Sequence, residues 1–121
     1  MPRRSLSLSF RDAFRGIGHV ISTQRNAKIQ CAIGLVTLIA AGILRLPPAD
    51  WAILAITVAT VLAAEAANTA LEEIVNAISP ELSEAARIAK DAAAGAVLLV
   101  AIGAVAVGLC ILGPPLWQAL H

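Results

Sequence analysis

The sequence predicts an all-α integral membrane protein, with three transmembrane helices preceded by an amphipathic surface helix. Hydrophobic residues make up 59% of the 121 residues and charged residues only 14%, and the mean hydropathy is +0.82. The apolar residues also gather into three long runs instead of being spread along the chain. A soluble domain of this length has too little interior to bury so much apolar surface, so the composition excludes an ordinary soluble fold.

The three apolar runs place membrane spans at about residues 27–44, 51–71 and 92–112. Each run is close to the roughly 20 residues that cross about 30 Å of hydrocarbon. No polar stretch long enough for a soluble domain separates them, so we expect residues 1–121 to form one membrane-embedded domain.

Two breaks divide the spans. The dipeptide Pro47-Pro48 predicts a sharp turn after the first span, with Asp50 capping the second helix. Ser79 suits an N-cap and Pro80 suits the first helical position, which predicts that the last helix begins there.

An amphipathic helix is predicted before the first span, at about residues 9–22. Phe10, Phe14, Ile17 and Val20 recur at helical spacing, while charged residues occupy the other side. Such a helix can lie in the membrane interface or pack on the bundle, and the sequence leaves both open.

The basic residues predict the orientation. Most of them cluster at the N-terminus or between the second and third spans, whereas the short first loop holds only Arg45. The positive-inside rule therefore places the N-terminus and the second loop in the cytoplasm, in a multi-pass protein of the inner (plasma) membrane. No apolar run directly follows the first basic residues, which disfavours a cleaved signal peptide.

A polar face interrupts the second span near its end. Spacings of three, four and seven residues put Glu65, Asn68 and Glu72 on one side of the helix. Counting from Asp50, Glu65 lies ~22 Å along this helix and Glu72 ~33 Å along it. A charged group at bilayer depth costs about 3 kcal/mol on insertion scales, which suggests a substrate path, a proton relay or a metal site.

Other polar residues fall at the same membrane face. Gln24 precedes the first span, and Lys90 and Asp91 precede the third. Glu65, inside the leaflet, could act as a general base toward a hydroxyl, and Glu72 could bind a divalent cation. Asn68 could orient either carboxylate, while Lys90 and Asp91 could bind phosphate and its metal.

These parts fit phosphoryl transfer to a lipid, although no Gly-rich phosphate loop is present. Ion or proton translocation through Glu65 fits the same residues. In a third interpretation the polar face only holds helices together.

Two motifs resemble those of the prokaryotic diacylglycerol kinase family. Residues 65–72 read EAANTALE, and residues 89–98 read AKDAAAGAVL. Residues 24–26 read QRN and are similar to the ERN that precedes the first span in the undecaprenol kinase branch. The resemblance covers about residues 10–112.

The resemblance implies a homotrimer of three-span subunits with shared sites. It implies transfer of the γ-phosphate of MgATP to a membrane lipid alcohol, with undecaprenol favoured and diacylglycerol a close second. By position, Glu65 is the expected general base and Glu72 a metal ligand. Asn68 would organise the site, and Lys90 and Asp91 would contact the nucleotide phosphates. No nucleic acid is expected as a partner.

The chain departs from the family pattern at Gln24, where the family usually has a second metal-binding glutamate. Glutamine keeps an oxygen ligand but loses the charge, so we expect Gln24 to contact the nucleotide-bound Mg²⁺ more weakly. Asn76 stands where the family often has aspartate, which again lowers the negative charge. Because of this departure at Gln24, a non-catalytic or proton-conducting membrane oligomer is the alternative to a lipid kinase.

Overall fold

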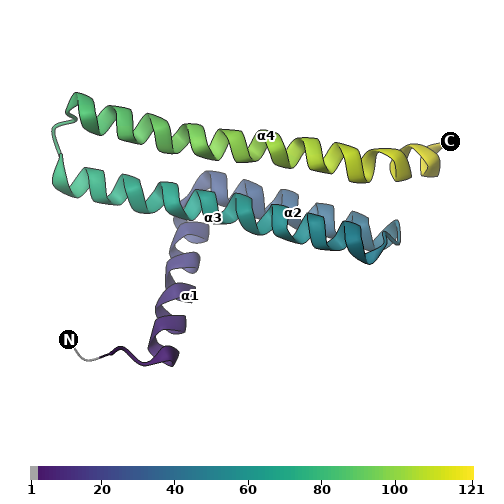
Figure 1. Cartoon of the computed structure of the whole chain (residues 1–121), viewed down its shortest axis with the longest axis horizontal. Coiled ribbons are helices and arrows are strands. Elements are labelled where there is room, and N and C mark those ends of the chain that lie inside the picture. The colour runs from purple at the N-terminus through teal and green to yellow at the C-terminus, as the bar shows by residue number, and fades with distance from the viewer. Residues whose placement is uncertain (1–2) are drawn as a thin grey trace.

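The computed structural model describes residues 3–121 as four α-helices, without strands in that range. They are α1 (Leu6–Thr23), α2 (Arg25–Ile43), α3 (Pro48–Ile78) and α4 (Glu84–Leu120). Helices α2, α3 and α4 lie side by side, and α1 projects from them at a steep angle (Figure 1). Each of these three is long and apolar enough to cross a membrane. The predicted all-α class with three spans is confirmed.

The helices extend beyond the spans that hydropathy predicts. At 1.5 Å per residue, the 31 residues of α3 and the 37 residues of α4 are ~47 Å and ~56 Å long, well beyond a ~30 Å hydrocarbon core. Hydropathy finds only the part of a helix that needs hydrocarbon, so the polar ends were left out of the predicted ranges.

Both predicted caps are wrong in detail. Ser79 is the C-cap of α3, and α4 begins only after Ser83, whose hydroxyl accepts a hydrogen bond from the Ala86 backbone nitrogen at 3.1 Å. Asp50 lies in the first turn of α3, because Pro47 is the N-cap and Pro48 already occupies the first turn. The sequence signals thus located both breaks but misplaced the helix ends by a few residues.

The interface between α2 and α3 is close because small residues face it. The buried residues of α2 are Ala27, Gly34 and Ala41, spaced seven apart. A Cβ added to Gly34 would lie 3.0 Å from Val58 Cγ1 on α3. Small side chains let two membrane helices approach in this way.

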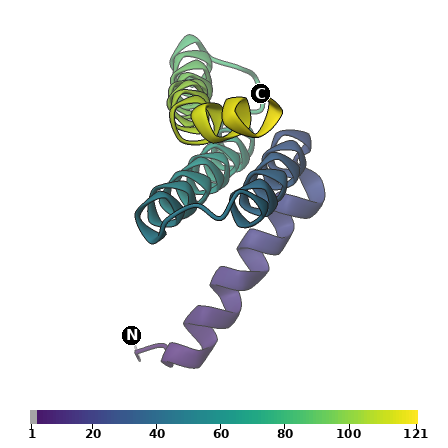
Figure 2. The same cartoon turned by 90° about the vertical axis from the view of Figure 1, so that its right-hand side faces the viewer.

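Helix α1 leaves most of its apolar face uncovered. Val20, near its C-terminal end, is buried, but Phe14 is 69% exposed and Phe10 58% exposed. Figure 2 shows α1 descending away from the three packed helices. Within the chain, α1 therefore packs on the bundle only near its end, and the geometry favours the interpretation of α1 as a membrane-surface helix.

Replacing Gly34 with leucine should force α2 and α3 apart. Overpacking of a close contact costs about 1–3 kcal/mol, and the free energy of unfolding measured by titration of mixed micelles with SDS should fall by that amount. Gly103, in α4, has open space around its Cα, so Gly103→Leu is the matched control. An equal loss of stability in both variants would contradict the proposed close contact.

Candidate active site

The polar face of α3 lies where the helical spacing predicts it. The Asn68 side-chain nitrogen donates a hydrogen bond to Glu72 Oε1 at 3.5 Å. The Thr69 hydroxyl donates to the backbone carbonyl of Glu65 at 2.9 Å, so its hydrogen-bonding capacity is used within the helix. The polar groups of this face that remain for a ligand are the Glu65 carboxyl, the Asn68 amide oxygen and the second oxygen of Glu72.

Glu65 is the most unusual of these residues, because it is only 3% exposed. Neither Glu65 Oε1 nor Asn68 Oδ1 has a hydrogen-bond partner among residues 3–121. Leaving a buried acceptor unsatisfied costs about 1–3 kcal/mol, and more for a charged group. Two adjacent unsatisfied oxygens on one helix face therefore point to a ligand that is not part of the chain.

Glu65 opens into a pocket of about 270 Å³ between α2 and α4, which we call the Glu65 pocket. On α2 the pocket is lined by Asn26, Ile29 and Gln30, and on α4 by small and aliphatic residues beginning at Ala94. Gln30 was not among the site residues predicted from the sequence. The pattern that could have identified it is its position four residues after Asn26, because this spacing places two amides on one face of an otherwise apolar span.

The predicted nucleotide contacts have partners of their own in the chain. Lys90 Nζ donates to Asn76 Oδ1 at 2.7 Å, which links α4 to α3. Asp91 pairs with Arg87 one turn earlier, at 3.2 Å. Gln24 joins α1 to α2, and its amide nitrogen donates to the Thr23 hydroxyl at 3.4 Å.

The single chain does not bring all the predicted site residues into contact. The structure pairs Asn68 with Glu72 and puts Glu65 and Gln30 in the lining of one pocket, whereas Lys90, Asp91 and Gln24 make other contacts. Asp91 is exposed, and Lys90 is held by a single neutral partner. Lys90 could exchange Asn76 for a phosphate group, because a charge-assisted bond to phosphate is stronger than a neutral one. Asp91, a carboxylate, could approach the phosphates only through a bound cation.

A divalent cation would have few protein ligands here. Within residues 3–121, no three His, Cys, Asp or Glu side chains gather at metal-binding distance. Mg²⁺ is commonly held by one or two carboxylates together with substrate phosphates. The Glu72 carboxylate, steadied by Asn68, fits that kind of site but would not hold a cation without a phosphate ligand.

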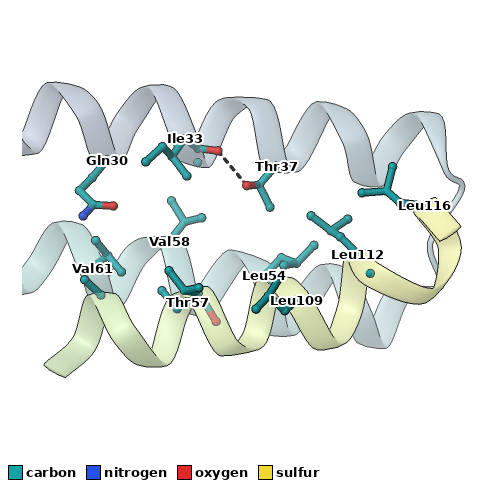
Figure 3. Close-up of a pocket in the computed structure, with 16 residues that line it drawn as sticks. Gln30, Ile33, Thr37, Leu54, Thr57, Val58, Val61, Leu109, Leu112 and Leu116 are labelled. Atoms are coloured by element: carbon teal, nitrogen blue, oxygen red, sulfur yellow. Dashed lines mark hydrogen bonds between the residues drawn. The ribbon is translucent and has the colours of Figure 1, made fainter. Parts of the chain in front are cut away.

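A second cavity adjoins the first. It is a groove of about 400 Å³ between α2 and α4, floored by α3, which we call the α2–α4 groove (Figure 3). Of its 16 lining residues, only Gln30, Thr37 and Thr57 have polar side chains. The two cavities share Gln30 and Ala101. The pocket that holds the Glu65 carboxyl is thus adjacent to an apolar groove within the size range of ligand sites.

Comparison with known proteins identifies relatives of this chain. Residues 11–112 match the family described as prokaryotic diacylglycerol kinase. The chain is 46% identical over 113 residues to a diacylglycerol kinase of Synechocystis sp., which is 93% of this chain and 65% of that protein. It is 35% identical over 108 residues to an undecaprenol kinase of Bacillus subtilis, 89% of this chain and 88% of that protein. No solved structure matches the chain.

The family match includes the polar face of α3, the Lys90-Asp91 pair and nearly all of the three long helices. It spans most of the sequence, and two relatives support it at 46% and 35% identity. The chain belongs to the prokaryotic diacylglycerol kinase family.

Proposed function

We propose that the protein is a membrane lipid kinase that transfers the γ-phosphoryl group of ATP to the hydroxyl of a lipid alcohol. The observation that carries the proposal is the buried Glu65 carboxyl, whose Oε1 has no partner among the described residues and which lines a pocket adjacent to an apolar groove. Such a site suits an acceptor with a polar end and an apolar chain. Both relatives are named as lipid kinases, which supports the same activity.

In the proposed reaction, Glu65 is the general base. Its carboxylate takes the proton of the lipid hydroxyl as that oxygen attacks the γ-phosphorus in line. The new bond joins the lipid oxygen to phosphorus, the bond to the β-phosphate oxygen breaks, and ADP leaves. Asn68 lies one turn from Glu65 and is bonded to Glu72. It would help to keep Glu65 as the base and Glu72 as the metal ligand.

The nucleotide would bind at the end of the bundle that carries Lys90. Lys90 would leave Asn76 to contact the phosphates, with Asp91 beside it. Glu72 and Gln24 would hold the Mg²⁺ of the nucleotide. When bound, this cation would offset the negative charge on the phosphate oxygens.

The acceptor would be undecaprenol or diacylglycerol. The residues Arg25 and Asn26 favour undecaprenol by their likeness to that branch, while the more similar of the two relatives is named a diacylglycerol kinase. Both acceptors are long-chain alcohols that fit an apolar groove leading to a carboxyl group.

We further propose a homotrimer in the inner membrane with a cytoplasmic active site. Many large apolar side chains of α4 are exposed in the single chain, including Leu98, Leu99 and Leu109. These are available for contact with lipid or with neighbouring subunits. The basic N-terminus supports a cytoplasmic position for α1 and the nucleotide site by the positive-inside rule.

The Glu65→Gln variant tests the proposed reaction. Amide replacement keeps the shape of the side chain but removes the base, so phosphoryl transfer should fall by roughly 10²- to 10⁴-fold. The measurement is transfer of labelled γ-phosphate from MgATP to undecaprenol and to diacylglycerol, offered in parallel to purified protein.

Glu73→Gln is the matched control, because Glu73 is an exposed carboxylate of the same helix. It should retain activity near that of the wild type. Size-exclusion chromatography should show the same assembly for all three proteins. A wild type that transfers phosphate to neither lipid would refute the kinase, and full activity in Glu65→Gln would refute the role of this residue.

The Gln24→Glu variant should need less Mg²⁺. A carboxylate near the bound cation adds about 0.5–1 kcal/mol of attraction at a partly exposed position, which lowers the half-saturating Mg²⁺ concentration roughly two- to fivefold. The measurement is a Mg²⁺ titration of the transfer rate. Gln118→Glu adds the same charge near the C-terminus and should leave the titration unchanged; equal shifts in both variants would argue against a metal contact at Gln24.

A further inference from the structure

Gln30 stands where the two cavities of the molecule meet. It lines the Glu65 pocket and also the α2–α4 groove, and the other residue common to both is the apolar Ala101. Figure 3 shows Gln30 at one end of the groove, extending from α2 toward Val61. Gln30 is therefore the polar group that a molecule lying along the groove would meet at its junction with the Glu65 pocket.

The other polar side chains of the groove are already satisfied. The Thr37 hydroxyl donates to the Ile33 carbonyl at 2.8 Å, and the Thr57 hydroxyl donates to the Ile53 carbonyl at 2.6 Å. Both bonds are within a helix and turn the hydroxyl hydrogen away from the groove. By contrast, the Gln30 amide makes no side-chain hydrogen bond within residues 3–121.

The depth of Gln30 makes a free amide costly. It lies five residues into α2, ~7.5 Å beyond Arg25 along the helix axis. Hydrocarbon offers no partner for an amide, so a side chain there needs one from the protein or from a ligand. Gln30, on α2, lines the same pocket as Glu65, on α3, whose Oε1 has no hydrogen-bond partner among residues 3–121.

We infer that Gln30 positions the acceptor lipid, by binding its hydroxyl at the junction of the Glu65 pocket and the α2–α4 groove. The inference rests on the proposed kinase function. The amide N–H donates to the hydroxyl oxygen, which leaves the hydroxyl hydrogen free to point at Glu65. The chain of the lipid lies in the groove, so the hydroxyl cannot slide past the base.

This assignment makes Gln30 a positioning residue with a specific kinetic signature. Losing one hydrogen bond of about 1.4 kcal/mol lowers kcat/KM for the lipid about tenfold. The KM for ATP should not change, because the amide lies on the groove side of the pocket and not among the predicted phosphate contacts. A residue with only a structural role would affect both substrates together.

The test measures transfer with the lipid and ATP varied separately, using wild type, Gln30→Met, Gln30→His and Thr60→Val. Methionine keeps the length of the side chain but has no N–H, and histidine restores a donor. Thr60→Val is the control, because it removes a hydroxyl that lies outside both cavities and is bonded to the backbone of its own helix. Gln30→Ala replaces Gln30→Met if the latter fails to assemble.

The expected result is about a tenfold lower kcat/KM for the lipid in Gln30→Met, recovery in Gln30→His, and wild-type values in Thr60→Val. Unchanged lipid kinetics in Gln30→Met, or an equal defect in Thr60→Val, would overturn the inference and leave the kinase intact. A rise in the KM for ATP alone would also overturn it. If the wild type transfers no phosphate to either lipid, the proposed function is refuted, and this inference is refuted with it.

Discussion

The structure depends on one constraint, which is that a carboxyl group must be held within an apolar bundle without a protein partner. Glu65 is almost fully buried, yet its Oε1 has no donor among the described residues. Such a group can persist only if the surrounding helices hold it in place and supply the missing stability. The close contact of α2 with α3, where Gly34 meets Val58, contributes to that rigidity about two helical turns along α3 from Glu65.

The same constraint explains why the three long helices differ in character. Helix α3 carries both the buried Glu65 and the buried apolar residues Leu54 and Val61, so it is the central element of the packing. Helix α2 faces α3 with small residues, whereas α4 has only Ala86 buried. The Glu65 pocket is therefore built on α3 and bordered by α2 and α4, and the exposed face of α4 is the side from which we propose that the lipid enters.

Sequence alone predicted the parts of this arrangement that follow from periodicity. Helical spacing placed Asn68 beside Glu72, and their hydrogen bond confirms it. Apolar run length identified three spans. Helix ends were less predictable, because Ser79 and Ser83 are both good caps and tertiary packing decides between them.

The contacts between helices could not be predicted from the sequence. The Lys90–Asn76 bond joins residues 14 apart and depends on how α3 and α4 align. The role inferred for Gln30 depends on two cavities that exist only when three helices pack. Spacing within one helix gives no information on either, because it does not fix the register between helices.

The most direct test of this account is the stability of Glu65→Met, measured as the free energy of unfolding in SDS titration. Methionine fills a similar volume without the unsatisfied oxygens. If the carboxyl is retained for chemistry at a cost in stability, the variant should be more stable than the wild type by about 1–3 kcal/mol while losing phosphoryl transfer. A variant less stable than the wild type would show that Glu65 holds the bundle together, and would contradict the account.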